Sequence, residues 1–293
     1  YDFIFQTNTH MSTPGHSLII GHTGGGKTVL ATWLMMQCLK FNGAQGNTPM
    51  RMLVFDAKKG CMIPIRAFGG SYQDACDQQL ELNPLQLPDS PGNRQFLERF
   101  LSMLAGGVDV AEERVIARAV AENYDYPPEF RTLHHLREMF GSKGTTAAGG
   151  RKLMDRLEKW FPDPDDPTMS HYVHGMVFNG QRDCLQFDQQ LVGFDMGDLL
   201  HDQGGKADLL APLTAYIFHG FQHYMAAKPV PHLAFFDEMW RYLKDPFFAS
   251  FIEEAYKEWR KLGGVVMGAV QNVSSLLDQP VGQEIINNTA TFL

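Results

Sequence analysis

Residues 16–39, HSLIIGHTGGGKTVLATWLMMQCL, decide the fold. Residues 16–20 are a short apolar run typical of a buried strand, and residues 28–39 carry apolar side chains at helical spacing. Between them, residues 21–28 match the pattern GxxxxGK[ST] in full. A strand, a glycine-rich loop and a helix in this order form a cradle for phosphate groups, because loop N–H groups point inward and the helix adds its positive N-terminus.

The cradle gives each of its residues an expected role. Lys27 would contact the β- and γ-phosphates of a nucleotide, and the Thr28 hydroxyl would ligate Mg²⁺. The same motif could instead be a glycine-rich turn with an exposed lysine, although the strand and helix around it favour the cradle. ATP and Mg²⁺ are therefore the predicted cofactors, with further nucleotide contacts expected at Gly21, Thr23, Gly24, Gly25, Gly26 and Val29.

Two later strands end in side chains suited to hydrolysis. The apolar residues 232–236 lead to Asp237 and Glu238 at the edge of the sheet where open α/β sheets bind ligands. Asp237 would hold Mg²⁺ through its water shell, and Glu238 would act as general base on the attacking water. Gln271 ends the next strand and could bridge the γ-phosphate or the water to a neighbouring subunit. Helix capping by the Asp-Glu pair, and an ordinary polar strand end at Gln271, are the structural alternatives.

Four further charged residues have two possible roles each. Arg260 is the first candidate for an arginine that acts in trans on the transferring phosphoryl group, and Arg241 is the second. Either could instead only stabilise a helix terminus. Asp56 and Lys58 follow the strand at residues 51–55, where they could line the nucleotide site or simply end the strand.

The rest of the chain alternates strands and helices around one helical segment. Strands are predicted at residues 51–55, 61–68, 191–194, 232–236 and 264–270, and a hairpin within residues 176–187 around Asn179 and Gly180. Residues 209–225 and 248–262 have helical patterns, and Asp195 and Asp198 are expected to cap a short helix. Residues 94–140 contain only helical patterns, residues 141–150 resemble a linker, and residues 151–160 a helix before the stop FPDPDDP. The prediction is an α/β protein with a mainly parallel sheet and an all-α insertion.

The composition limits the classes of function. The chain has 293 residues, 25 Lys+Arg and 33 Asp+Glu, so its formal net charge is 25 − 33 = −8. That balance provides no whole-chain attraction to nucleic acid, which makes nucleic acid a possible but disfavoured partner. The four cysteines form no CxxC pair, so neither a zinc site nor a disulfide framework is indicated. Apolar runs of about 18 residues, which membrane spans need, do not occur.

Six segments together resemble the C-terminal motor domain of the CagE/TrbE/VirB family of type IV secretion (conjugation) ATPases. They are GHSLIIGHTGGGKT (15–28), LVFDAKKGCMIPIRAFGG (53–70), LNPLQLPDSPGNRQFL (82–97), VFNGQRDCLQFDQQLVGFDMGDLL (177–200), AFFDEMWRYL (234–243) and WRKLGGVVMGAVQNVSSLL (259–277). The resemblance implies a RecA-like P-loop NTPase domain from residues 1–90 and 170–293, and an insertion at 91–169. It also implies that this chain is a segment of a longer polypeptide.

The family resemblance further implies a biological setting. Such a motor would form hexamers or dimers and contact other secretion components at the cytoplasmic face of the bacterial inner membrane, where it would power pilus biogenesis and substrate transfer. The family's phosphate loop falls on Gly21, Gly26, Lys27 and Thr28, its second carboxylate motif on Asp237 and Glu238, its sensor on Gln271, and its Arg-Lys stretch on Arg260. Departures are mild, with Gly25 where Ser is common and Met239 where Ala or Pro is usual.

Two other functions compete with a secretion motor. One is a DNA-translocating motor of the coupling-protein, HerA or FtsK type, which the net charge disfavours. The other is an inactive nucleotide-binding scaffold, which would not need Glu238 or Gln271.

Overall fold

The computed structural model describes residues 15–40, 49–75, 80–141, 147–160, 177–202, 206–227 and 230–293. The chain divides into two compact units, one from residues 1–75, 186–214 and 220–293, the other from residues 76–185 and 215–219. The assignment of residues 91–169 as an insertion domain, with 1–90 and 170–293 as the nucleotide-binding domain, stays a prediction.

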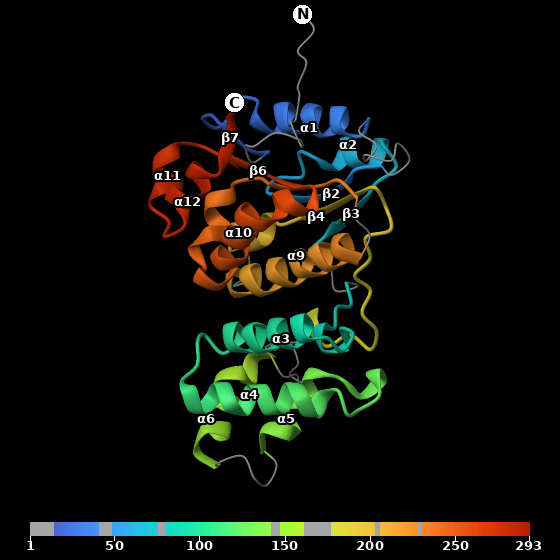
Figure 1. Ribbon diagram of the computed structural model, residues 1–293, viewed down its shortest axis with the longest axis vertical. Coiled ribbons are helices and arrows are strands. Elements are labelled where there is room, and N and C mark those ends of the chain that lie inside the picture. The colour runs from blue at the N-terminus through green and yellow to red at the C-terminus, as the bar shows by residue number, and fades with distance from the viewer. Residues whose placement is uncertain are drawn as a thin grey trace, which may run out of the picture. The chain divides into compact units, whose positions relative to one another are not determined.

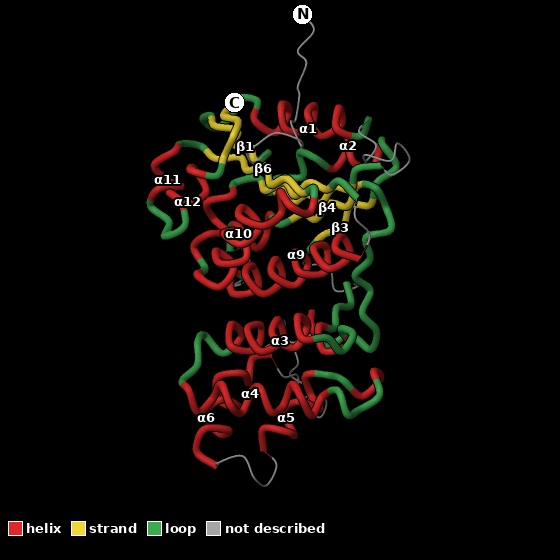
Figure 2. Tube along the Cα trace, in the orientation of Figure 1, coloured by secondary structure: helices red, strands yellow, loops and turns green. Residues whose placement is uncertain are grey.

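The first unit is built on a seven-stranded sheet in the order β3-β4-β2-β5-β6-β1-β7. All its pairings are parallel, which confirms the predicted α/β class with a mainly parallel sheet. Figure 2 shows the strands between helices. The strands are β1 (His16–Ile20), β2 (Arg51–Asp56), β3 (Ser71–Asp74), β4 (Leu191–Asp195), β5 (His232–Phe236), β6 (Gly264–Val270) and β7 (Thr289–Phe292).

Helices cover both faces of this sheet, with α1 and α2 on one face and α9 and α10 on the other (Figure 1). Because both faces are covered, β5 is buried at every position, as is typical of parallel sheets. No helix within the described ranges has the length and hydrophobicity to cross a membrane. The helices are α1 (Lys27–Cys38), α2 (Met62–Ala67), α8 (Gly197–Leu200), α9 (Leu210–Ala227, of which residues 215–219 are counted with the second unit), α10 (Pro246–Glu258), α11 (Val273–Leu277) and α12 (Gly282–Asn287), with 3₁₀ turns at Ala207–Leu209, Met239–Lys244 and Trp259–Leu262.

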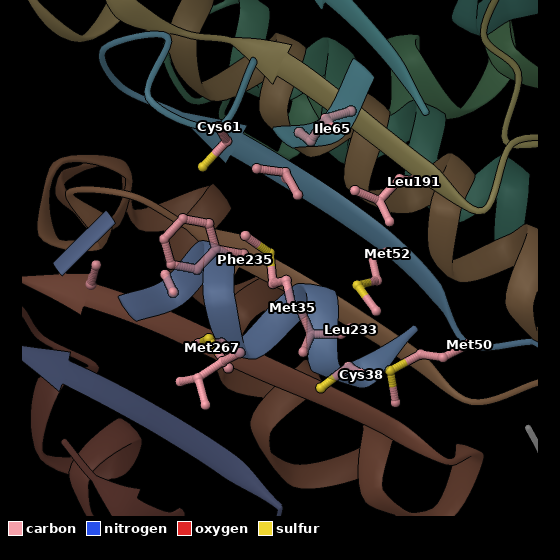
Figure 3. Packing of buried hydrophobic residues seen from close by; sticks show 14 of the residues in the cluster. Met35, Cys38, Met50, Met52, Cys61, Ile65, Leu191, Leu233, Phe235 and Met267 are labelled. Carbon is pink, nitrogen blue, oxygen red and sulfur yellow. The ribbon is translucent and has the colours of Figure 1, made fainter. Parts of the chain in front are cut away.

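The core beneath α1 is rich in sulfur-containing side chains. Met35 and Cys38 of α1 belong to one buried cluster with Met52, Leu233 and Met267 from three neighbouring strands (Figure 3). Methionine is flexible and fills irregular gaps, so these residues adapt the helix surface to the twisted sheet. The packing fixes α1 against strands β2, β5 and β6.

His16 links β1 to two other elements and should make stability depend on pH. Its Nδ1 accepts a hydrogen bond from Val266 N–H, and its Nε2 lies 3.0 Å from the carbonyl oxygen of Tyr256, to which it can donate. This pairing requires a neutral ring, and burial lowers the pKa of His16 to about 4. The folded pKa lies below the unfolded value of about 6.5, so this contribution is complete above pH 6.5 and is lost as the pH falls towards 4.

His16→Asn tests this linkage. The loss of unfolding free energy caused by the substitution should be roughly 2 to 3 kcal/mol smaller at about pH 4.5 than at pH 7. Urea unfolding of both proteins at both pH values measures it. Other titrating groups, such as Asp237, cancel because they are present in both proteins. An equal loss at the two pH values would contradict the assignment.

The second unit contains helices and connecting loops, without a strand, among its described residues. Residues 94–140 fall on the three helices α3, α4 and α5 and the turns between them, which agrees with their helical apolar spacing. The N-termini of α3 and α4 are capped, α3 by the Ser90 side chain and α4 by a capping box of Asp109 and Glu112. The helices are α3 (Pro91–Leu104), α4 (Val110–Asn123), α5 (Leu133–Gly141) and α6 (Ala147–Leu157), with 3₁₀ turns at Pro84–Gln86, Pro128–Phe130 and Glu158–Trp160.

Arg156→Met should destabilise the second unit. Arg156 Nη1 lies 3.2 Å from Glu112 Oε2, and the Glu112 side chain is only 3% exposed, so removing the guanidinium leaves a buried carboxylate without its cation. We expect a loss of about 2 to 3 kcal/mol in unfolding free energy, below the full value for a buried pair because Arg156 is partly exposed. Arg118→Met is the matched control, because its pair with Glu122 is exposed on both sides and should contribute less than about 1 kcal/mol. Equal losses in urea unfolding would contradict this.

Three sequence-based assignments are wrong in this structure. Residues 61–68, predicted as a strand, contain helix α2. Pro64 is tolerated in the first turn of α2, because the backbone N–H that proline lacks would have no partner within the helix at that position. No hairpin forms in the described part of residues 176–187; instead, Gly180 N–H bonds Leu82 O and Cys184 N–H bonds Glu81 O. Helix α6 begins at Ala147, inside the predicted linker. Residues 142–146 and the stop at residues 161–167 lie outside the described residues.

Candidate active site

The phosphate loop connects β1 to α1 and has the shape that its glycines predict. Gly24 and Gly26 have φ of 80° and 82°, which L side chains rarely adopt, and α1 begins directly afterwards at Lys27. The Lys27 ammonium donates to the carbonyl oxygen of His22 at 3.1 Å, so it lies over the loop. The loop residues from His22 to Gly26 are exposed and accessible to a ligand.

The other predicted loop residues lie around this turn. Gly21 N–H donates to Val270 O at 3.2 Å, which joins the loop to the end of β6. A Cβ on Gly25 would lie 3.0 Å from the His22 carbonyl oxygen, so a serine there would crowd the turn. Thr23 is exposed, Thr28 is half-buried at the helix start, and Val29 is 75% exposed.

Asp237 and Glu238 lie just beyond β5, where the sequence places them, and both are buried. Asp237 N–H donates to Phe55 O at 2.9 Å, and its Oδ1 accepts from Glu238 N–H at 3.1 Å. Burial raises the pKa of Asp237 to about 6, and the nearby carboxylates of Asp56 and Glu238 add to the shift. This accumulation of negative charge is an environment that a cation would stabilise.

The donor set fits Mg²⁺ delivered with a nucleotide. Mg²⁺ prefers oxygen ligands and usually keeps several waters while binding one or two protein oxygens and the substrate phosphates. The Thr28 hydroxyl and the Asp237 carboxylate are oxygen donors of this kind. Within the described ranges no group of three or more His, Cys, Asp or Glu could hold a metal ion.

Glu238 has a strained backbone and two cationic partners. Its φ of 52° and ψ of 44° place a non-glycine residue in the left-handed region, a strain that clusters at functional sites. Glu238 Oε1 lies 3.5 Å from Lys58 Nζ, and Oε2 lies 2.5 Å from Arg241 Nε. Arg241, the second candidate for action in trans, is therefore engaged within its own chain.

Asp56, which the sequence left undecided, organises the loop after β2. Its Oδ1 accepts from Lys58 N–H at 3.1 Å, and its Oδ2 accepts from Cys61 N–H at 2.7 Å and Tyr72 Oη–H at 2.9 Å. The Asp56 side chain is thus occupied by its own loop and by β3. In the sequence, the only signal for this loop is the strand that ends in DAKKG. The pairing of β2 with β5 in the sheet is what places the loop beside Asp237 and Glu238.

The loop after β2 carries a second lysine, Lys59, which faces the end of β4. Strand β4 is the neighbour of β2 on the side opposite β5. Lys59 Nζ lies 3.1 Å from Asp195 Oδ2, and this hydrogen bond raises the pKa of Lys59. Asp195 Oδ1 also accepts from Gly197 N–H at the start of α8. The predicted capping pair is not formed as such, because Met196 is the N-cap residue of α8 and Asp198 lies within the first turn, although Asp195 binds the first helical N–H. Asp195 also binds a lysine that the sequence did not associate with it.

Gln271 and Arg260 flank β6 at its opposite ends. Gln271 follows Val270, whose carbonyl oxygen binds the phosphate loop, and β6 pairs with both β5 and β1. The Gln271 backbone thus lies between the loop and the Asp237–Glu238 pair. The Arg260 backbone lies before β6, so the seven residues of this strand, roughly 20 Å, separate it from the end that carries Gln271. The Arg260 side chain lies outside the described residues.

Comparison with known proteins gives relatives over nearly the whole chain, although no family model matches. The type IV secretion system protein PtlC of Bordetella pertussis is 31% identical over 94% of this chain and 33% of that protein. The type IV secretion system protein virB4 of Bartonella henselae is 28% identical over 98% of this chain and 34% of that protein. The chain spans about one third of the length of these relatives.

Solved structures establish the fold. VirB4 of Thermoanaerobacter pseudethanolicus superposes with a TM-score of 0.71 at 18% identity, covering 95% of this chain and 77% of that one. The plasmid coupling protein TrwB in complex with ADP and Mg²⁺ superposes with a TM-score of 0.60 at 16% identity, covering 94% and 69%. These similarities confirm the RecA-like P-loop fold.

Proposed function

Because the chain belongs to the family of type IV secretion proteins that includes PtlC and VirB4, we propose that it is the Mg²⁺-dependent ATPase motor of such a system. The observation that carries the proposal is one sheet edge with a full phosphate loop after β1 and two buried carboxylates after β5. Hydrolysis would drive pilus biogenesis and substrate transfer in secretion or conjugation.

The proposed roles follow from the geometry. The loop from Gly21 to Gly26 holds the phosphates through its backbone N–H groups, and Lys27 moves from the His22 carbonyl onto the β- and γ-phosphates. Thr28 would hold Mg²⁺ directly and Asp237 through its water shell, and the bound ion would supply charge neutralisation at the phosphates. Glu238 accepts the proton of the attacking water as general base.

Assembly completes the proposed site. Gln271 contacts the γ-phosphate or the water beside Glu238, and Arg260 acts on a neighbouring subunit, which suits its place before β6, at the end away from Gln271. The chain therefore works in a self-assembly of hexamer or dimer type. Its other partners are secretion components at the cytoplasmic face of the inner membrane.

The ATPase rate as a function of protein concentration, with and without DNA, tests the proposal. A specific rate that rises with concentration and does not depend on DNA supports it, because an arginine supplied in trans requires a neighbour. Stimulation by DNA that falls steeply with salt would favour a coupling-protein motor instead. Nucleotide binding without hydrolysis at any concentration would indicate a scaffold.

A further inference from the structure

The carboxylate of Glu238 is held at both oxygens by cations from its own chain. Arg241 Nε approaches Oε2 to 2.5 Å, and Lys58 Nζ lies 3.5 Å from Oε1. The Glu238 side chain is 7% exposed, so water screens these charges less than at a surface. An isolated buried carboxylate would be disfavoured, and the two cations compensate for its burial.

Each cation is itself fixed from a different side. Arg241 Nη1 donates to Leu200 O at 2.6 Å, at the end of α8, so one guanidinium bridges α8 and Glu238. Lys58 stands on the 57–61 loop, whose backbone Asp56 holds at Lys58 and Cys61. The position of the Glu238 side chain is thus fixed relative to two segments that follow other strands, α8 after β4 and the 57–61 loop after β2.

The 57–61 loop also touches the phosphate loop. A Cβ on Gly60 would lie 2.7 Å from Thr28 Cγ2, so the Gly60 backbone packs directly against the proposed Mg²⁺ ligand. Lys58, two residues earlier, reaches Glu238. One short, internally hydrogen-bonded loop therefore spans the distance between the phosphate loop and the proposed base.

We propose that Arg241 and Lys58 are positioning residues that hold the Glu238 carboxylate towards the phosphate loop, an inference that rests on the proposed function. A strained backbone at Glu238 needs its side chain held from outside, because a small misplacement of a reacting group lowers the rate strongly. Arg241 thereby acts in cis on the base of its own subunit.

The two residues should differ in the size of their effects. Arg241 makes the shorter contact and is anchored at Leu200, so Arg241→Met should lower kcat roughly 10- to 100-fold. The Lys58 side chain is 58% exposed and its contact is longer, so Lys58→Met should lower kcat by about two- to fivefold. The KM for ATP and the Kd for Mg²⁺·ADP should stay within about twofold of the unmodified protein, since neither residue contacts the phosphate loop.

Steady-state ATPase kinetics and calorimetry with Mg²⁺·ADP test the proposal on the 293-residue chain at one concentration. Lys59→Met is the matched control for Lys58→Met, because Lys59 is the next residue, is 60% exposed and pairs with Asp195 instead of Glu238. Arg241→Lys should recover part of the lost kcat, because a lysine can pair with Glu238 but cannot also reach Leu200 as a guanidinium fork does.

The outcomes separate this inference from the proposed function. Absence of hydrolysis by the unmodified protein at every protein concentration refutes the function and the inference together. Hydrolysis that Arg241→Met leaves unchanged or raises, or that changes only in KM, refutes the inference alone. If Arg241→Met fails to fold, the exposed Lys58→Met decides, and an equal kcat for Lys58→Met and Lys59→Met would then overturn the proposal.

Discussion

Lys27→Ala should abolish measurable ATP turnover, with kcat reduced at least about a hundredfold. Lys27 is the cation of the phosphate loop, and its ammonium already lies over the loop against the His22 carbonyl. It would neutralise charge on the β- and γ-phosphates both on binding and in the transition state, so ATP affinity should fall as well. Phosphate release measured under saturating ATP, together with nucleotide binding, gives both effects.

Lys40→Ala is the control for this substitution. Lys40 follows the other end of α1 and donates to Gln37 at 2.5 Å, so the variant removes the same charge from the same helix region without touching the loop. Its turnover should equal that of the unmodified protein. Substantial hydrolysis by Lys27→Ala would refute the proposed phosphate loop.

Glu238→Gln should stop hydrolysis while leaving ATP bound. Glutamine preserves the size of the side chain but cannot accept a proton from water, and general base catalysis contributes about 10²- to 10⁴-fold. Because Lys27 and the loop backbone remain, nucleotide affinity should persist. Rapid filtration of the variant after incubation with labelled ATP should recover intact ATP, where the unmodified protein yields ADP.

Glu253→Gln is the comparison for charge loss alone. Glu253 lies on α10 and pairs with Lys257 at 2.5 Å on the surface. The variant should hydrolyse ATP normally. Turnover by Glu238→Gln close to that of Glu253→Gln would remove Glu238 from the mechanism and return the Asp-Glu pair to a capping role.

The sequence predicts the centre of the sheet better than its edges. Strands β1, β2, β5 and β6 are continuous apolar runs because both faces of the sheet are covered, and such runs can be recognised without knowledge of their partners. Edge strand β3 has the polar sequence SYQD and gave no strand signal. It forms because β4 offers an open edge, which is a long-range effect.

The errors in the prediction have local causes. In residues 61–68 an apolar run too short to show its period was taken as a strand, although Ile63 is 74% exposed and only one face of α2 is buried. Around Asn179 and Gly180, a dipeptide typical of hairpins instead meets distant partners. The Asn179 side chain accepts from Leu133 N–H, and Gly180 packs on Glu81.

At the candidate site, motif spacing predicts the functional residues that follow strands β1 and β5. It does not predict the residues that hold the side chain of Glu238 in place. Lys27, Thr28, Asp237 and Glu238 were placed by pattern. Lys58 was left undecided, because the sequence does not state that β2 lies beside β5; the sheet order brings Lys58 to Glu238. Arg241 was only the second candidate for action in trans, because the sequence does not show the 3₁₀ turn that places it against Glu238 three residues earlier.

The position of β1 in the sheet has a consequence for biosynthesis. Ser17 pairs with Met267 and Thr291, so the strand that carries the phosphate loop has partners only among the last thirty or so residues of this segment. Pairings this distant in sequence form slowly, whereas α3 packs against α4, and α5 against α6, and the members of each pair are close in sequence. On a ribosome, these helix pairs can fold first. We therefore expect a nascent chain to bind no nucleotide until β7, which ends at Phe292, has left the ribosome and paired with β1.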